Sequence, residues 1–225
     1  MDVGQTIFHV LEIIGVVAFA LSGAMTALER DFDIFGVIVM GITTALGGGM
    51  TRDIILGRFP PAMFENFSSV LIAIVTSLAT FVVAYIARDE YKKQTKAIDQ
   101  INNIFDAIGL GVFSVLGVSI SIDCGHFDNT FLCIFLGTIT GVGGGLLRDI
   151  MSKSKPMIFV KRIYAIASIA GSAVYYLLLF FKVSDWISIT VSIAVTFVLR
   201  ILATKFEWSL PKVNLSDGKE EARHK

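Results

Sequence analysis

The chain of 225 residues contains only two cysteines, three histidines and four prolines, and 17% of its residues are charged. Cys124 and Cys133 do not form a Cys-x-x-Cys motif, so they are expected to be apolar packing residues rather than a redox site. His9, His126 and His224 lie at the ends of apolar runs or of the chain, without the spacing of metal ligands. No Ser/His/Asp set can be assembled at membrane depth, so the sequence does not indicate an enzyme.

Neither sign of charge dominates, because 19 basic residues face 19 acidic ones. No cluster of basic and aromatic residues occurs, so nucleic acid is not an expected partner, and no metal or other cofactor is expected. By contrast, 54% of the residues are hydrophobic and the mean hydropathy is +0.73. A soluble domain of this length carries more charge, so the composition predicts a membrane protein.

Seven apolar runs have about the 20 residues that a helix needs to cross a bilayer. They are Ile7–Leu28, Ile34–Leu56, Phe67–Ala87, Ile104–Ile122, Thr130–Ile150, Val160–Phe181 and Trp186–Ala203. The first run is too long for a signal-peptide core and is expected to be a retained helix. The longest connection is the predicted polar loop 88–103, and the tail 204–225 is expected to be disordered at its end. The predicted fold class is an all-α membrane protein.

The chain repeats itself. The segment Gly47–Ile54, GGGMTRDI, recurs 96 residues later as Gly143–Ile150, GGGLLRDI. A second set of residues, shifted by 94 positions, comprises Glu12, Gly15, Phe19 and Gly23 in the first copy and Asp106, Gly109, Phe113 and Gly117 in the second. A duplicated, strongly apolar unit indicates a transport protein rather than an enzyme.

The basic residues predict the orientation. The connections after the first, third and fifth spans, the start of the sixth span and the C-terminal tail contain Arg30, Arg88, Lys92, Lys93, Lys96, Lys153, Lys155, Lys161, Arg162, Lys205 and Lys212. The opposite side contains Arg58 and Lys182, with Arg52 at a span end. The positive-inside rule therefore places the N-terminus outside and the C-terminus in the cytoplasm, with the chain in the inner (plasma) membrane.

An odd number of spans in each copy turns the second copy upside down relative to the first. We therefore expect two inverted three-helix repeats, at residues 1–90 and 91–182, followed by a seventh helix and a cytoplasmic tail at 183–225.

The glycine triplets Gly47-Gly48-Gly49 and Gly143-Gly144-Gly145 lie within predicted spans. Each glycine disfavours a helix by about 1 kcal/mol relative to alanine, so the triplets predict a kink or local unwinding that lines a pathway. Close packing of membrane helices on small residues is the alternative interpretation. A phosphate loop is disfavoured, since neither the Lys-Ser/Thr pair nor a preceding strand is present.

Two arginines follow the triplets, and an arginine within a membrane is usually paired or faces water. The topology places Glu12 near Arg52 and Asp106 near Arg148, which predicts two pseudo-symmetric ion pairs at the mouths of a pathway. The adjoining Asp53 and Asp149 are expected to point elsewhere on their helices. The alternative is a structural role, in which the arginines snorkel to the interface.

Small hydroxyl residues are the expected lining between the two mouths. They are Ser22, Thr43, Thr44, Ser114, Thr138 and Thr140. Each can equally bond the backbone of its own helix.

The doubled Gly-Gly-Gly-x-x-Arg-Asp motif, the Glu/Asp-x-x-Gly-x-x-x-Phe openings and the closing Trp208-x-Leu210-Pro211 resemble the prokaryotic trimeric intracellular cation channel (TRIC) family, whose bacterial branch is also labelled a glycine-transporter domain. The resemblance spans Glu12 to Pro211. It implies a homotrimer in which each subunit conducts monovalent cations, mainly K⁺, between kinked second and fifth helices. In this chain it makes both glycine triplets the kinks and places Arg52 and Arg148 beside the pore.

Three functions are therefore under consideration. A K⁺ channel needs a continuous wet path with weak sites. A secondary carrier of a small zwitterion such as glycine would bind a carboxylate at an arginine, and inverted repeats suit alternating access. A membrane scaffold leaves the repeated Arg-Asp unexplained. The Lys-Glu-Val phosphoinositide motif of the animal family members is absent, although Lys92, Lys93 and Lys96 could attract anionic membrane lipids.

Overall fold

The computed structural model describes residues 3–160, 163–206 and 208, and these residues form helices without a strand. The long helices are α1 (Val3–Leu28), α2 (Ile34–Ile55), α4 (Ser68–Ile86), α6 (Thr95–Ser121), α7 (Thr130–Met151), α9 (Ile163–Phe180) and α10 (Asp185–Lys205). The short ones are α3 (Ala62–Glu65), α5 (Arg88–Lys93) and α8 (Met157–Val160), and a π-helical turn, η1 (Ile122–His126), follows α6.

Seven of the described helices are long and apolar enough to cross a membrane, which confirms the predicted spans. The connection expected as a polar loop at 88–103 is wrong, because it is occupied by α5 and the first nine residues of α6. The reason is visible in the sequence: Ile98 and Ile101 are spaced three apart, and Ile98 is buried. Three of the basic residues used to predict the orientation lie outside the described residues, namely Lys161, Arg162 and Lys212. Most of the predicted tail lies outside them as well.

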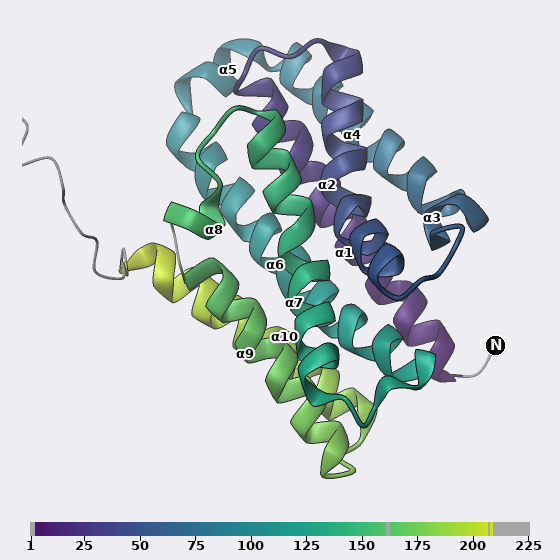
Figure 1. Ribbon diagram of the computed structural model, residues 1–225. Coiled ribbons are helices and arrows are strands. Elements are labelled where there is room, and N and C mark those ends of the chain that lie inside the picture. Colours follow the sequence, from purple (N-terminus) through teal and green to yellow (C-terminus); the bar gives the residue numbers. More distant parts are fainter. Residues whose placement is uncertain (1–2, 161–162, 207, 209–225) are drawn as a thin grey trace, which may run out of the picture.

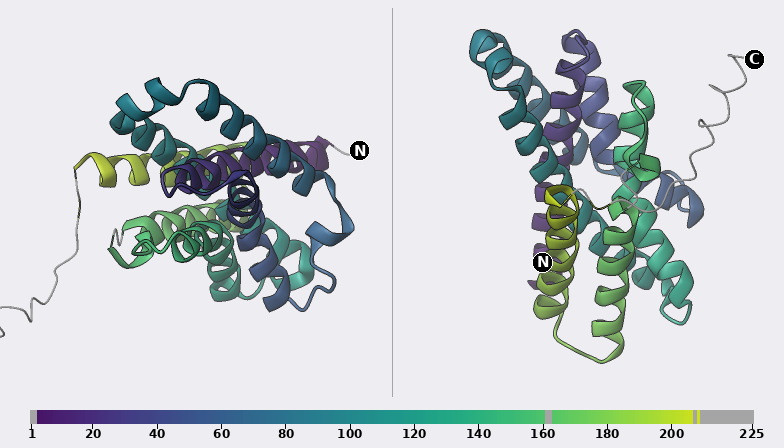
Figure 2. Two further views of the ribbon diagram at one scale, coloured as in Figure 1. Left: turned by 90° about the horizontal axis from the view of Figure 1, so that it is seen from above. Right: turned by 90° about the vertical axis from the view of Figure 1, so that its left-hand side faces the viewer.

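Helices α1, α2, α6 and α7 form the centre of the bundle (Figure 1). The main apolar cluster joins Phe19 of α1, Leu46 of α2 and Phe113 of α6, with the Phe19 and Phe113 rings 5.2 Å apart. Helix α4 packs on α1 and α2, whereas α9 and α10 form an antiparallel hairpin against α6 (Figure 2). The bundle end that carries η1 and the start of α1 is called the α3 end, and the opposite end is called the α5 end.

Equivalent helices of the two sequence copies run in opposite directions: α1 runs toward the α5 end and α6 away from it, and α2 and α7 also oppose each other (Figure 1). Their ends are built alike. The side chain of Asp33 caps α2 by accepting from the amide of Gly36, and Asn129, 96 residues later, caps α7 through Leu132. Both helices end before a residue with positive φ, Gly57 or Lys153.

The glycine triplets do not unwind their helices. Both α2 and α7 are continuous across them, so the predicted local unwinding is wrong. The close-packing interpretation applies instead: a Cβ on Gly48 would collide with the carbonyl oxygen of Thr140, and one on Gly144 with that of Thr44. In lipid an unpaired backbone group is expensive, whereas three helical glycines cost only about 1 kcal/mol each, so the backbone keeps its hydrogen bonds and the helices approach closely.

We predict that Gly48→Ala lowers the stability of the protein by about 1–3 kcal/mol, because the added methyl group forces α2 away from α7. Gly49→Ala is the matched control, since its Cβ would meet only ordinary contacts, the nearest being Arg52 Nη2 at 3.6 Å. This control should be neutral or slightly stabilising. Thermal unfolding of both variants in detergent measures the difference; equal melting temperatures would contradict the packing role.

Candidate functional site: two arginine centres and two cavities

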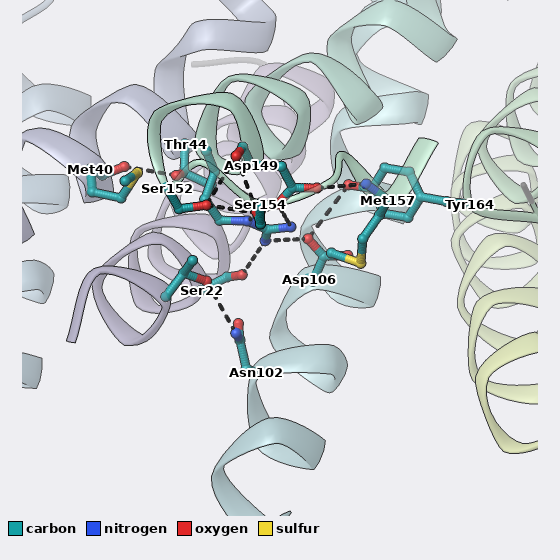
Figure 3. Close-up of polar contacts among 12 residues, drawn as sticks. Ser22, Met40, Thr44, Asn102, Asp106, Asp149, Ser152, Ser154, Met157 and Tyr164 are labelled. Carbon is teal, nitrogen blue, oxygen red and sulfur yellow. Dashed lines mark hydrogen bonds and ion pairs between the residues drawn. The ribbon is translucent and has the colours of Figure 1, made fainter. Parts of the chain in front are cut away.

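Arg148 lies at the α5 end of α7 and is 1% exposed. Its Nη1 donates to Asp106 Oδ1 of α6 at 2.7 Å and to Ser22 Oγ of α1 at 2.6 Å (Figure 3). Its Nε and Nη2 donate to Asp149 Oδ1 at 3.0 and 2.9 Å. One guanidinium therefore ties three helices together, and each of its three nitrogens donates to at least one partner.

The predicted pair of Asp106 with Arg148 is confirmed by the 2.7 Å ion pair. The expectation that Asp149 points elsewhere is wrong, because an arginine is long enough to fold back onto the carboxylate of the next residue. The snorkelling alternative does not describe Arg148, whose side chain is 2% exposed.

A second buried arginine, Arg200 of α10, was missed by the sequence reasoning. It is 1% exposed, its Nη2 lies 3.7 Å from Asp106 Oδ2, and its guanidinium carbon lies 5.1 Å from the centre of the Tyr164 ring. Asp106 thus faces two arginines, and Asp106 and Asp149 together balance the charges of Arg148 and Arg200. A lone arginine within the last apolar run was the available signal, since such residues are rarely without a partner.

The centre at the α3 end follows the same local pattern with different partners. Arg52 donates from Nε and Nη2 to Asp53 Oδ1 at 2.9 and 2.8 Å. The predicted ion pair between Glu12 and Arg52 is wrong, because Glu12 instead accepts a hydrogen bond from Ser69 Oγ of α4 at 2.8 Å. A serine at the start of α4 is close enough to satisfy the carboxylate, and the neighbouring Asp53 satisfies the arginine.

Each aspartate of the Arg-Asp motif has two tasks. Its Oδ1 binds the arginine, and its Oδ2 accepts the amide at the start of the next short helix. Asp53 Oδ2 binds the amide of Ala62 at 3.0 Å, and Asp149 Oδ2 that of Met157 at 2.7 Å. The repeated motif therefore fixes both the arginine and the loop that follows it.

Two cavities lie near these centres. The outer cavity, of about 240 Å³, is at the α3 end. Its charged and polar lining consists of Glu12, Arg52, Asp53, Arg58, Asn66 and Ser69. The inner cavity, also of about 240 Å³, is at the α5 end. It is lined by Asp99, Asn102, Asn103, Asp106 and Met157.

The predicted lining hydroxyls lie elsewhere. Thr44 and Thr140 donate to Met40 O and Leu136 O of their own helices, and Ser114 donates to Leu110 O. The hydroxyl groups are buried at the helix crossings and line neither cavity. Their alternative role, bonding the backbone of their own helix, is the one observed.

Thr43 is half-buried, and Thr138 also donates to its own helix, at Ile134 O. Ser22 differs from the other hydroxyl residues, because it binds Arg148.

A protein-family model described as Glycine transporter matches the chain twice, at residues 9–85 and 103–180. The chain belongs to this family. The two matches correspond to the two sequence copies. Relatives include the UPF0126 membrane protein YvgT of Bacillus subtilis, 31% identical over 91% of this chain and 95% of the relative, and the inner membrane protein YadS of Escherichia coli K12, 32% identical over 92% and 97%. The chain is thus a multi-pass membrane protein.

Solved structures extend the family relationship. One solved structure, described as "Structural basis for conductance through TRIC cation channels", matches this chain with a TM-score of 0.79 and 37% sequence identity. The match covers 93% of this chain and 98% of the solved chain. The structure of the TRIC orthologue from Rhodobacter sphaeroides matches with a TM-score of 0.81 and 28% sequence identity, and the match covers 91% of this chain and 100% of the orthologue's. These family members are cation channels and not enzymes, and the resemblance to TRIC channels is confirmed.

We predict that Asp106→Asn destabilises the protein by about 3–5 kcal/mol, because Arg148 and Arg200 then lack a shared counter-charge in the interior. Glu12→Gln is the matched control at the equivalent position of the other copy, where the carboxylate binds one serine and no arginine. Denaturation in detergent compares the two variants. Similar melting of Asp106→Asn and Glu12→Gln would show that the buried ion pairs contribute little.

Proposed function

We propose that the chain forms a K⁺-permeable cation channel, with a pathway in each subunit between α2 and α7 and a homotrimeric assembly. The observation that carries the proposal is the pair of carboxylate-lined cavities at opposite ends of the bundle, on either side of the α2–α7 crossing. Carboxylates at the mouths of a path attract cations and exclude anions. The similarity to cation-channel structures over nine tenths of the chain supports it.

The crossing itself suggests that this arrangement is a closed one. Gly48 and Gly144 bring the two backbones into contact between the cavities. Under the proposal, ions pass when α2 and α7 separate there, and both triplets, Gly47–Gly49 and Gly143–Gly145, supply the flexibility for a kink. Arg52, Asp53, Arg148 and Asp149 would then flank the path as mouth charges.

The membrane arrangement is part of the same proposal. Residues 1–90 and 91–182 would form inverted three-helix repeats, and residues 183–225 would add the seventh helix and the tail. The α5 end would face the cytoplasm, because Arg30, Arg88 and Lys96 belong to that end. Basic residues there would also meet anionic membrane lipids.

The direct test is a planar bilayer recording of the purified protein under a KCl gradient. Unitary currents that reverse near the K⁺ equilibrium potential are the expected result. Currents that reverse near the Cl⁻ potential would contradict cation selectivity, and a silent bilayer would contradict the channel.

We predict that Glu12→Gln lowers the K⁺ conductance at low salt, because it removes a negative charge from the outer cavity. The effect should fade near 1 M KCl, where the screening length falls to about 3 Å. Glu65→Gln is the control, since Glu65 is exposed on α3 and does not line the cavity. A conductance loss that is independent of salt, or that is shared by both variants, would argue against an electrostatic role.

The secondary carrier is a second candidate, favoured by one feature of the outer cavity. Glu12 and Arg58 place opposite charges around a partly enclosed space, an arrangement that suits a small zwitterion. Saturable accumulation of labelled glycine in liposomes, with a silent bilayer, would support the carrier. Currents without glycine uptake would reject it.

A further inference from the structure

A third hollow, called the α5 groove, lies at the α5 end and has a volume of about 480 Å³. It shares no lining residue with the outer or the inner cavity. One wall is formed by the end of α1 and the connection to α2, and the other by the end of α4, by α5 and by the start of α6 (Figure 1). Among the described residues, α5 packs mainly on its chain neighbours α4 and α6, so the two walls stay apart. The volume is within the roughly 300–1,000 Å³ of ligand sites.

One half of the α5 groove is apolar and lies within the membrane spans. Its lining includes Phe81, Ala84 and Tyr85 of α4. The span formed by α4 ends at Ile86, and that formed by α1 ends at Leu28. The Phe81 and Tyr85 rings stack with their centres 6.3 Å apart, and Tyr85 is 74% exposed. A tyrosine at the end of a span marks the level of the lipid headgroups, so this half suits the apolar part of a lipid.

The other half of the α5 groove lies beyond the ends of these spans and has charges of both signs. The wall from α5 and α6 supplies Arg88 and the hydroxyl residue Thr95, whereas the wall from the end of α1 and the connection to α2 supplies Glu29 and Asp31. Among the described residues, the side chains of Arg88 and Asp31 have neither a hydrogen bond nor an ion pair. Opposite walls therefore present an unpaired cation and an unpaired carboxylate.

The balance of charge in this half is negative. Two carboxylates, Glu29 and Asp31, line the groove with one arginine, Arg88. Burial, together with the negative charges of Glu29 and Asp99, raises the pKa of the lining residue Tyr91 to about 12. A headgroup with a net negative charge is therefore disfavoured in the groove. A headgroup that combines a phosphate with an ammonium group matches both walls.

We propose that the α5 groove binds a phospholipid of the phosphatidylethanolamine class. Arg88 and the Thr95 hydroxyl bind the phosphate, and the ammonium group donates to the carboxylates of Glu29 and Asp31 on the opposite wall. A primary ammonium has three N–H donors for these carboxylates, whereas a choline group has none, so ethanolamine is preferred to choline. The occupant is a membrane lipid rather than a soluble phosphoamine, because the groove continues into the apolar half at Tyr85.

The test is thermal unfolding of the full chain in detergent with increasing mole fractions of dioleoylphosphatidylethanolamine. The matched lipids are phosphatidylcholine and phosphatidylglycerol with the same acyl chains. The ethanolamine lipid should raise the melting temperature of the wild type more than either of them, since a ligand that binds the folded state stabilises it. An equal effect of the ethanolamine and choline lipids would overturn the ammonium contact. A larger effect of the glycerol lipid would assign the groove to an anionic headgroup and overturn the proposal.

Two variants test the charges on opposite walls. Arg88→Gln and Asp31→Asn should each raise the half-maximal mole fraction of the ethanolamine lipid by roughly fivefold, the effect of removing one unit charge about 4 Å from its partner in water. Asp31 has a φ of 56°, which asparagine also adopts, so the second variant keeps its turn. Each variant is compared with its own melting temperature without lipid, so a change in basal stability does not enter the result.

Arg30→Gln and Asp89→Asn are the matched controls. They remove the same charges from exposed positions at the α5 end that do not line the groove. Both should keep the wild-type response to the ethanolamine lipid. A response that the controls weaken as much as Arg88→Gln and Asp31→Asn would reduce the effect to general surface charge and overturn the site.

Two further outcomes identify other occupants of the α5 groove. Glycerophosphoethanolamine, the headgroup without acyl chains, should not stabilise the protein at the concentrations at which the lipid does. Equal stabilisation by both would assign the groove to a soluble ligand. If the lipid has no effect and Arg88→Gln changes the oligomeric state in size-exclusion chromatography, a second copy of the chain covers the groove, and the proposal is overturned.

Discussion

The structure depends on the neutralisation of two arginines in an interior that offers no bulk water. Asp106 is the shared partner of Arg148 from α7 and Arg200 from α10, and Arg148 also holds Ser22 of α1. A charge left unpaired at this depth would cost several kcal/mol, so four of the long helices are tied to one carboxylate. The same ion pairs hold α10, which lies outside both family-model matches, against α6.

The two ends of the bundle show how one duplicated motif serves two environments. At the α5 end the arginine is fully enclosed and recruits partners from neighbouring helices. At the α3 end Arg52, among the described residues, pairs with its adjacent aspartate and borders the outer cavity. The difference lies in the surroundings, because Ser69 rather than Arg52 binds the carboxylate of Glu12. The geometry of the Arg-Asp motif is therefore the same in both copies, whereas the charged and polar groups around it differ.

Much of the fold was predictable because its signals are local. Apolar runs of about 20 residues gave the seven spans, and the position of Asp106 in the duplicated pattern correctly predicted its pairing with Arg148. The local unwinding expected at the glycine triplets was wrong, because the helix propensity of glycine carries no information about contacts with a facing helix. Only the contacts of Gly48 with Thr140 reveal that the glycines serve packing.

The candidate site was harder to predict, because its partners come from residues distant in sequence. The hydrogen bond of Ser69 to Glu12 spans 57 positions, and nothing in either segment indicates it. Arg200 could have been found from its place in an apolar run, but its neighbours Tyr164 and Asp106 could not.

The double use of Asp53 and Asp149 has a mechanical consequence. Because one oxygen of each carboxylate holds the arginine and the other holds the start of the following short helix, the guanidinium and the loop form a single rigid unit. A movement of either arginine that shifts its aspartate therefore also shifts the loop that follows the helix.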